Sequence, residues 1–370
     1  MIFFITTPFS MEKPTRNQLE RLGLKCLKVT EGKVYFEGNQ EDLAKVLVNI
    51  RCGDRVFWEI ASFSATTFDE LFDNIVKINW ADIIQENGKI NVSAKCARSR
   101  LMSVPDTQRI SKKAIITAMQ RKIKKDILKE NGATYPIDIH IHSDLVTVAL
   151  DCAGAGLHKR GYRIKNAVAP LRETFASGLI EISGFRGNCA FSDLFCGSGT
   201  LPIEATLKAL NIAPNMNRTF ACESFKNFNK AVFDRARNNA KNQIQDKDIL
   251  VFASDISPEM VDMAKYHAKL AGVEGKIKFS VKRAGDMVPQ AEKGILISNV
   301  PYGERIGDEK YMQELSFEIG QMLNKYSSWN KYILSGYKNL ERYAKKRADK
   351  TRRFYNGNIE CNLYNFFEKK

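Results

Sequence analysis

The segment Asp193-Leu-Phe-Cys-Gly-Ser-Gly-Thr-Leu-Pro-Ile-Glu-Ala205 decides how the second half of this chain folds. The apolar residues that lead up to Asp193 predict a strand, and the residues from Thr200 onward predict a helix. Between them, Gly197 and Gly199 allow a tight turn and the close approach of a ligand to the backbone. The segment lacks the third glycine of a dinucleotide-binding turn and the Gly-Lys-Ser/Thr of a phosphate-binding loop. The alternative is a tight strand–helix turn that binds nothing.

The alternation of strand and helix continues on both sides of this segment. From about residue 171 onward, apolar strands alternate with helical stretches, which predicts a parallel, doubly wound α/β sheet. Asn356-Gly357 near the C-terminus predicts a hairpin, which would place one antiparallel strand on an otherwise parallel sheet. The predicted parallel strands cover residues 189–195, 250–254, 277–281, 295–298 and 331–334.

Two further carboxylates follow strands of this predicted sheet. Asp255 comes at the end of the strand at 250–254, where an acid commonly binds a ribose diol. A helix then begins, with Ser257 as its cap and Pro258 as its first residue. The alternative is that Asp255 only helps to cap this helix and binds no ligand. Asp286 follows the next strand and is a candidate to hold an adenine amino group. Asp193, the acid before the glycine turn, suits a ligand with a cationic amino group, and S-adenosylmethionine has such a group.

The tetrad Asn299-Val-Pro301-Tyr302 follows the predicted strand at 295–298. The Asn299 side chain offers an amide oxygen to the N–H of an aromatic amine, and a turn at Pro301 would point a backbone carbonyl at the second N–H. Tyr302 offers a flat face on which a base stacks. Two acceptors that favour a pyramidal nitrogen make its lone pair available for attack on a sulfonium methyl group, and positioning supplies the larger part of the rate. The alternative is a proline turn at a strand end.

The first 155 residues predict two small mixed units. Residues 1 to about 60 show strands at 2–7, 27–29 and 33–36 and helices at 13–22 and 41–50. Residues 61–155 add a helix at 68–77, a strand at 89–94, a long helix from Pro105 to about Lys129, and strands at 137–141 and 145–150. Residues 156–170 form a basic connector punctuated by glycine.

Positive charge dominates the composition. The chain has 57 Lys and Arg against 42 Asp and Glu, a formal net charge of +15, which favours a polyanionic partner, nucleic acid first. Between Lys95 and Glu130, eleven basic residues accompany three acids, and a second basic segment, Lys338 to Arg353, holds eight against two. A solvated helix face is the alternative for the first of these runs.

Other patterns in the chain argue against several kinds of site. No stretch approaches the length of a membrane span, and the start of the chain predicts a strand rather than a signal peptide. The eight cysteines form no CxxC pair, which favours reduced thiols in the cytoplasm and argues against zinc. We expect no metal at His140 and His142, because no third ligand lies nearby in the sequence. Cys196 falls inside the glycine turn, which argues against a cytosine-C5 nucleophile.

Four motifs together carry a resemblance over nearly the whole chain. The chain resembles the THUMP-domain RNA methyltransferase family, in the branch similar to bacterial large-subunit ribosomal RNA guanine-N2 methyltransferases (RlmL-like and YpsC-like proteins). The motifs are Leu157-His-Lys-Arg-Gly-Tyr-Arg163, Ala169-Pro-Leu-Arg-Glu-Thr174, the segment Asp193–Ala205, and Asn299-Val-Pro-Tyr-Gly-Glu-Arg305.

The resemblance implies a Rossmann-like class I methyltransferase domain with a mostly parallel seven-stranded sheet and one antiparallel strand. It implies a ferredoxin-like unit at 1–60, a THUMP α+β domain for RNA binding at 61–155, a connector at 156–170 and the methyltransferase domain at 171–370. The family usually has Asn-Pro-Pro-Tyr, whereas this chain has Val300 in place of the first proline. The acceptor at Asn299 and the turn at Pro301 are kept, and the shape of the pocket and the identity of the base stay open.

The residue roles that we expect fall into three groups. The catalytic group is Asn299, Pro301 and Tyr302. The group that binds S-adenosylmethionine is Thr174, Asp193, Cys196, Gly197, Ser198, Gly199, Thr200, Asp255, Ile256, Asp286, Met287 and Asn299. The RNA-binding group is Arg98, Arg100, Lys112, Lys113, Arg121, Lys122, Lys124, Lys125, His158, Lys159, Arg160, Tyr162 and Arg163.

The sequence therefore predicts a cytoplasmic enzyme that forms N2-methylguanosine in structured RNA, with 23S ribosomal RNA or a pre-ribosomal particle as its partner. An adenine-N6 or cytosine-N4 methylase on RNA or DNA uses the same tetrad and stays open as an alternative. A non-catalytic RNA-binding ribosome-assembly factor is the alternative from another class. The sequence predicts no oligomeric state.

Overall fold

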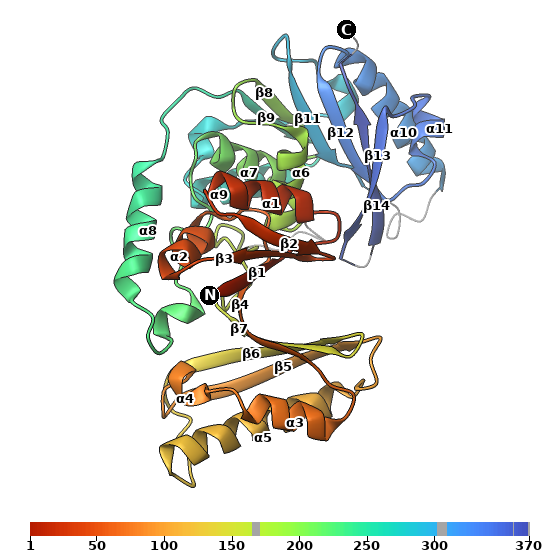
Figure 1. Cartoon of the computed structure of the whole chain (residues 1–370). Coiled ribbons are helices and arrows are strands. Elements are labelled where there is room, and N and C mark those ends of the chain that lie inside the picture. Colours follow the sequence, from red (N-terminus) through yellow and green to blue (C-terminus); the bar gives the residue numbers. More distant parts are fainter. Residues whose placement is uncertain (165–170, 302–308, 358, 369–370) are drawn as a thin grey trace.

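A computed structural model describes residues 1–164, 171–301, 309–357 and 359–368. The described strands form two seven-stranded sheets with helices packed against them (Figure 1). Sheet A contains β1 (Ile2–Thr6), β2 (Cys26–Thr30), β3 (Lys33–Glu37), β4 (Arg55–Ser64), β5 (Lys89–Ala97), β6 (Thr134–His142) and β7 (Leu145–Asp151). Sheet B contains β8 (Ala190–Asp193), β9 (Val251–Asp255), β10 (Lys278–Val281), β11 (Gly294–Asn299), β12 (Asn330–Ser335), β13 (Lys350–Asn356) and β14 (Ile359–Phe366).

The helices follow the order of the sheets along the chain. Sheet A is accompanied by α1 (Glu12–Arg21), α2 (Gln40–Asn49), α3 (Phe68–Val76), α4 (Trp80–Ile83) and α5 (Val104–Ile123). The remaining helices are α6 (Glu173–Ser183), α7 (Thr200–Ala209), η1 (Ala221–Ser224), α8 (Lys230–Asn242), α9 (Pro258–Leu270), η2 (Glu274–Lys276), η3 (Ala284–Asp286), α10 (Glu309–Lys325) and α11 (Leu340–Ala344).

Sheet B is the predicted doubly wound sheet. Its strand order is β10-β9-β8-β11-β12-β14-β13, and the first five strands are parallel. β14 runs antiparallel to both of its neighbours, β12 and β13. Two apolar cores lie on its two faces, one with residues of α6, α7 and α9 and one with residues of α10 and α11. The prediction of a mostly parallel sheet with one antiparallel strand is confirmed.

Sheet A is continuous across the two small units that the sequence predicted. Its order is β2-β3-β1-β4-β7-β6-β5. The ten-residue strand β4 pairs with β1 through Arg55–Glu59 and with β7 through residues 57–64. The expected boundary at residue 60 therefore falls inside β4, and one backbone ladder joins both units.

The helices α3 and α5 pack together on one face of β5 and β6, and this face points away from the rest of the molecule (Figure 1). In the described part of the chain, the opposite face of β5 and β6 carries no helix and is turned toward the second half of the chain (Figure 1). The prediction that α5 continues to about Lys129 is wrong. The helix ends at Ile123 because Lys124 adopts a left-handed conformation (φ 59°), and its N–H donates to the Gln120 carbonyl.

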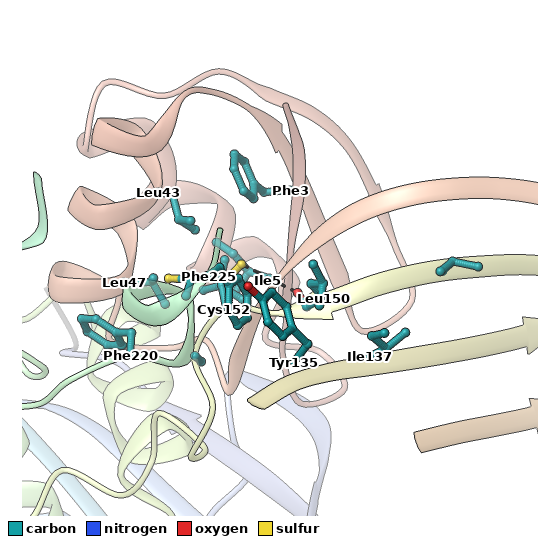
Figure 2. Packing of buried hydrophobic residues seen from close by; sticks show 14 of the residues in the cluster. Phe3, Ile5, Leu43, Leu47, Tyr135, Ile137, Leu150, Cys152, Phe220 and Phe225 are labelled. Carbon is teal, nitrogen blue, oxygen red and sulfur yellow. Dashed lines mark hydrogen bonds between the residues drawn. The ribbon is translucent and has the colours of Figure 1, made fainter. Parts of the chain in front are cut away.

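A segment that the sequence assigned to the methyltransferase domain packs into the core of the N-terminal half. Residues of this segment, from Ala213 to Ala240, belong to the same apolar cluster as Phe3, Leu47 and Leu150 (Figure 2). The Phe225 ring stacks on the Tyr135 ring of β6, with centroids 4.9 Å apart. The Tyr135 hydroxyl also accepts the Lys226 N–H over 2.8 Å. This insertion connects the two halves of the chain through a shared core.

We predict that Phe225→Ala lowers the free energy of unfolding by about 3–5 kcal/mol, because it removes a buried ring and leaves a cavity between the two halves. Urea unfolding followed by circular dichroism measures this loss. Phe317→Ala is the matched control, since the Phe317 side chain is 47% exposed, and its effect should be about 0.5 kcal/mol or less. Equal effects of the two substitutions would show that the stacked pair does not stabilise the junction.

Candidate active site

A cavity of about 940 Å³ lies at the edge of sheet B where β8, β9, β10 and β11 end. Ligands of open α/β sheets bind at this carboxyl edge, near the point where the strand order reverses. Here the order reverses between β8 and β11, because the chain runs outward from β8 to β9 and β10 and then returns to β11. The loops after all four strands line the cavity, together with one face of α10 and the turn between β13 and β14.

The glycine turn after β8 needs both of its glycines. Gly197 has φ 48° and Gly199 has φ 87°, in the left-handed region that favours glycine. A Cβ on Gly199 would lie 2.9 Å from the Cβ of Ala264 in α9, whereas one on Gly197 would meet nothing within 4 Å. The turn is thus closely packed on the α9 side and open beside Gly197, which lines the cavity. The buried His267 of α9 contacts the Ser198 carbonyl through its Nδ1 over 3.0 Å.

Asp255 ends β9 and fastens two backbone segments. Its Oδ2 accepts the Gly197 N–H over 2.9 Å, and its Oδ1 accepts the Ser257 N–H over 3.0 Å at the start of α9. The cap of α9 is Ser257, as predicted, since its hydroxyl accepts the Met260 N–H over 3.3 Å. A carboxylate oxygen has two lone pairs, so each oxygen keeps one with which to accept a hydroxyl group from the cavity that Asp255 lines.

Asp193 is buried at the end of β8, and its carboxylate lines the same cavity. Its Oδ1 accepts the Ser298 hydroxyl over 2.8 Å and the Phe195 N–H over 3.2 Å. Burial raises the pKa of Asp193 from its ordinary value to about 7, against the lowering by these hydrogen bonds. A cationic group placed beside it would favour the charged form.

Asn299 ends β11 and lines the cavity opposite the glycine turn. Its side-chain oxygen is buried and has no hydrogen-bond partner among the described residues. Buried polar atoms normally have partners, and an exception needs an explanation. An N–H donor from a ligand in the cavity would supply the missing bond.

Val300 replaces the proline that the family usually has, and the structure shows what the change brings. The Val300 N–H donates to the Leu334 carbonyl of β12 over 3.1 Å, a bond that proline could not make. The Val300 side chain is buried against Leu194 and Leu315 in an apolar core. The substitution therefore keeps Asn299 at the sheet edge, followed by Pro301 at the cavity. Tyr302 lies outside the described residues.

The remaining residues expected to hold S-adenosylmethionine divide into two sets. Cys196, Ser198, Thr200 and Ile256 line the cavity, but Asp286 and Met287 do not, because Arg283 and Ala284 form the wall there. Thr174 is fully buried, its Oγ1 donates to Asp54 Oδ1 over 2.6 Å, and it does not line the cavity, so its place at the cofactor stays a prediction.

The Cys196 thiol is not set up as a nucleophile. Burial raises its pKa well above the ordinary value, so the reactive thiolate is scarce at neutral pH. This agrees with the sequence-based argument against a cytosine-C5 mechanism.

Three of the connector residues that we expected to bind RNA make hydrogen bonds and ion pairs within the protein instead. The Arg160 side chain is 1% exposed and donates to the Leu157 carbonyl over 2.7 Å and to Asn215 Oδ1 over 3.1 Å. Tyr162 is buried and donates to Glu204 Oε1 over 3.0 Å. Arg163 is mostly covered and pairs with Glu173 over 3.2 Å. The expected RNA contacts of Arg160 and Tyr162 are wrong, because a buried side chain cannot reach a polyanion, and the RNA contact of Arg163 stays a prediction. Lys159 is exposed and His158 is half-buried.

The basic residues around α5 are more paired than the sequence indicated. Lys112 pairs with Glu130 over 2.9 Å, and Lys125 pairs with Glu86, so the opposing acids come from distant segments rather than from the helix itself. Lys124 and Lys125 lie beyond the helix end. Exposed cations without a described ion pair remain at Arg98, Arg100, Lys113, Arg121, Lys122 and Lys124.

Several cavity residues were missed from the sequence. Leu171 and Arg172 precede α6 and Met260 lies on α9, while Tyr311, Glu314, Leu315 and Glu318 come from α10. The predicted Asn356-Gly357 turn also lines the cavity, a role that only its position over the sheet edge reveals. Among the described residues, no cluster with metal-ligand chemistry occurs and no helix is long and apolar enough to cross a membrane.

These residues fit S-adenosylmethionine by their chemistry. Asp193 offers an anion for its ammonium group, and Asp255 offers acceptors for its ribose diol. Ile256, Met260 and Leu315 offer apolar contacts for an adenine ring. The strand order, the antiparallel β14 and the position of the cavity define a class I methyltransferase fold.

The comparisons identify the family. The model of the RMKL-like methyltransferase domain matches residues 160–365, that of the RlmL ferredoxin-like domain matches 2–57, and that of the THUMP domain matches 65–151. The chain belongs to the RMKL-like methyltransferase family, with an RlmL-type ferredoxin-like domain and a THUMP domain before the methyltransferase domain.

The chain is similar over most of its length to several known proteins. It is 38% identical to YpsC of Bacillus subtilis (strain 168), a candidate RNA methyltransferase, over 98% of this chain and 95% of that protein. It is 30% identical to the ribosomal RNA large subunit methyltransferase K/L of Shewanella frigidimarina over 98% of this chain, which spans only 52% of that protein. The crystal structure of SMU.472, a candidate methyltransferase complexed with SAH, superposes with a TM-score of 0.94 at 34% identity, covering 100% of this chain and 98% of that one.

We predict a pH dependence of stability from Asp193. In the unfolded chain the carboxyl titrates near its ordinary value, about 3.9, whereas in the folded chain its pKa is about 7. Between these values the folded state holds a proton that the unfolded state has lost. The contribution of this group is therefore fully present below about pH 4 and is lost as the pH rises through 7.

Asp193→Asn removes this titration, so the free energy of unfolding of the variant relative to the parent should rise between pH 4 and pH 7. Urea unfolding at several pH values, without cofactor, measures the difference. The control is Asp286→Asn, since Asp286 is exposed. If the Asp193→Asn and parent curves run parallel across this range, Asp193 does not titrate as described.

Proposed function

We propose that this chain methylates the exocyclic N2 amine of guanine in large-subunit ribosomal RNA. S-adenosylmethionine is the methyl donor of its methyltransferase domain. The observation that carries the proposal is the buried, unpartnered Asn299 amide oxygen, which shares one cavity with the glycine turn and with Asp193 and Asp255.

The chemistry of an arylamine explains why these groups are needed. The lone pair of such a nitrogen delocalises into the ring, so the amine is a poor nucleophile until it becomes pyramidal. Asn299 Oδ1 accepts one N–H, and the Pro301 carbonyl accepts the other, which together stabilise the pyramidal form. When bound, S-adenosylmethionine supplies an electrophilic methyl group, and one N–C bond forms as one S–C bond breaks. The methylated nitrogen is acidic, so its surplus proton leaves to water without a strong base.

One side of the cavity would hold the methyl donor, and the other side would hold the acceptor base. Asp193, the Gly197–Gly199 turn and Asp255 hold the donor on the β8 and β9 side, and Asn299 and Pro301 hold the acceptor at the end of β11. Because β8 and β11 are adjacent parallel strands, both groups lie at one edge of the sheet. Fixing two reactants in this way contributes up to about 7–11 kcal/mol to the lowering of the barrier.

RNA is favoured over DNA as the substrate by the N-terminal half and by the relatives. The THUMP domain at 65–151 and the net charge of +15 suit a polyanion, and the K/L relatives are named for large-subunit ribosomal RNA. Adenine-N6 methylation is the rival product, because Asn299 can accept from either amine.

We test the product by mass spectrometry of nucleosides. Ribosomal RNA from a strain that lacks the protein is incubated with the protein and S-adenosylmethionine, and duplex DNA is treated in parallel. We expect N2-methylguanosine to appear in the large-subunit RNA alone. N6-methyladenosine as the product, or methylation of the DNA, would contradict the proposal.

We predict that Asn299→Ala abolishes turnover and leaves the affinity for S-adenosylmethionine within a few-fold, because Asn299 contacts the acceptor rather than the donor. Calorimetry measures the affinity, and radioactive methyl incorporation measures turnover. Asp255→Ala is the reciprocal control and should weaken cofactor binding by about ten-fold or more, since it removes two charge-assisted bonds. If Asn299→Ala loses cofactor affinity as strongly as Asp255→Ala, the acceptor site is misplaced.

A further inference from the structure

A second cavity, of about 720 Å³, lies beside the helix-free face of sheet A. Asn91, Ser93 and Lys95 alternate along β5 onto this face. The loop that follows β7 closes another side with Gly154, Gly156 and His158. This cavity is distinct from the active-site cavity and is more polar.

Arg172 lines both cavities. It is the residue before α6 and is exposed, and its carbonyl accepts the Ala176 N–H over 2.9 Å, whereas its guanidinium makes no hydrogen bond or ion pair with a described residue. One unpaired guanidinium therefore lies between the place where the target base binds and the helix-free face of the THUMP sheet.

Three cations, Arg55, Lys95 and Arg172, and three carboxylates line the second cavity. Asp151 pairs with Arg55, Asp138 Oδ1 lies 2.6 Å from His140 Nε2, and Asp54 accepts the Thr174 hydroxyl over 2.6 Å. Lys95 has no ion-pair partner among the described residues, and neither has Arg172.

His158 adds a neutral polar group to this wall. Burial lowers its pKa, with Arg172 and Lys159 contributing in the same direction and Asp54 opposing them. Its Nδ1 is buried without a hydrogen-bond partner in the described part of the chain. A neutral imidazole can donate to or accept from a ribose hydroxyl.

We propose that the RNA strand crosses this second cavity, over the helix-free face of sheet A, and that Arg172 binds the backbone phosphate next to the target nucleotide. The proposal rests on the proposed function. A guanidinium matches a phosphate with two parallel N–H···O bonds, and Lys95 is placed for a neighbouring phosphate. The α5 surface is the less suitable path, because α5 covers the opposite face of the sheet, away from the active site (Figure 1).

The test measures RNA binding and methyl transfer separately, for the parent, Arg172→Ala, Arg172→Lys and the control Arg186→Ala. Arg186 is also exposed, but it precedes β8 and so lies at the opposite edge of sheet B. The probe is unmodified 23S ribosomal RNA transcribed in vitro, titrated by filter binding at several salt concentrations.

Arg172→Ala should weaken RNA binding about ten-fold and reduce the slope of log affinity against log salt by about 1, the value for one lost phosphate contact. Arg172→Lys should keep the slope and lose part of the affinity, and Arg186→Ala should match the parent. S-adenosylmethionine affinity should be unchanged in Arg186→Ala.

An affinity and salt slope of Arg172→Ala equal to those of the parent would overturn this proposal, even if N2-methylguanosine forms. If Arg172→Ala loses binding as described but the parent forms a different product, the RNA path stands and the proposed product falls. A slope change with duplex DNA of the same size as with RNA would also overturn it, since the site would then recognise any polyanion.

Discussion

Ser298 donates to Asp193 Oδ1 over 2.8 Å and accepts the Leu194 N–H over 3.0 Å, and it is the residue before Asn299. These two buried hydrogen bonds fasten the carboxyl end of β11 to the carboxyl end of β8. The loop that would hold the methyl donor and the loop that would hold the acceptor amine therefore have a fixed separation. A transfer that depends on alignment needs this constraint more than it needs a strong acid or base.

Packing at this edge of the sheet determines which residues can be replaced, as Val300 and Gly199 show. Val300 keeps the apolar core filled and adds a backbone hydrogen bond to Leu334, so loss of the usual proline leaves Asn299 at the sheet edge. Gly199 has no such freedom, because α9 approaches it closely and its φ is positive. Position 300 of the tetrad can therefore accept another apolar side chain that fills the core. Position 199 of the glycine turn cannot accept a side chain, because α9 leaves no room for one.

The N-terminal half is built as a part of the enzyme rather than as a separate module. The strand β4 pairs with β1 of the ferredoxin-like unit and with β7 of the THUMP unit. The insertion that contains η1 and α8 returns from the methyltransferase domain into the core that the two units share. The helix-free face of sheet A is thereby directed toward the active site, which is the arrangement that an RNA strand held at both places requires.

The sequence by itself determined the alternation of strands and helices in the second half of the chain, the glycine turn, and the carboxylates and Asn299 at strand ends, because these depend on residues close together in the chain. It also determined the antiparallel hairpin at Asn356-Gly357, since that turn is local. It did not predict β4, which joins the two N-terminal units. Only the tertiary structure decided that Arg160 and Tyr162 lie inside, that Thr174 bonds to Asp54, and that Phe225 packs on Tyr135, because each of these partners comes from a distant segment. A run of basic residues shows where charge is, and the fold decides which of those charges are already neutralised by acids brought in from elsewhere.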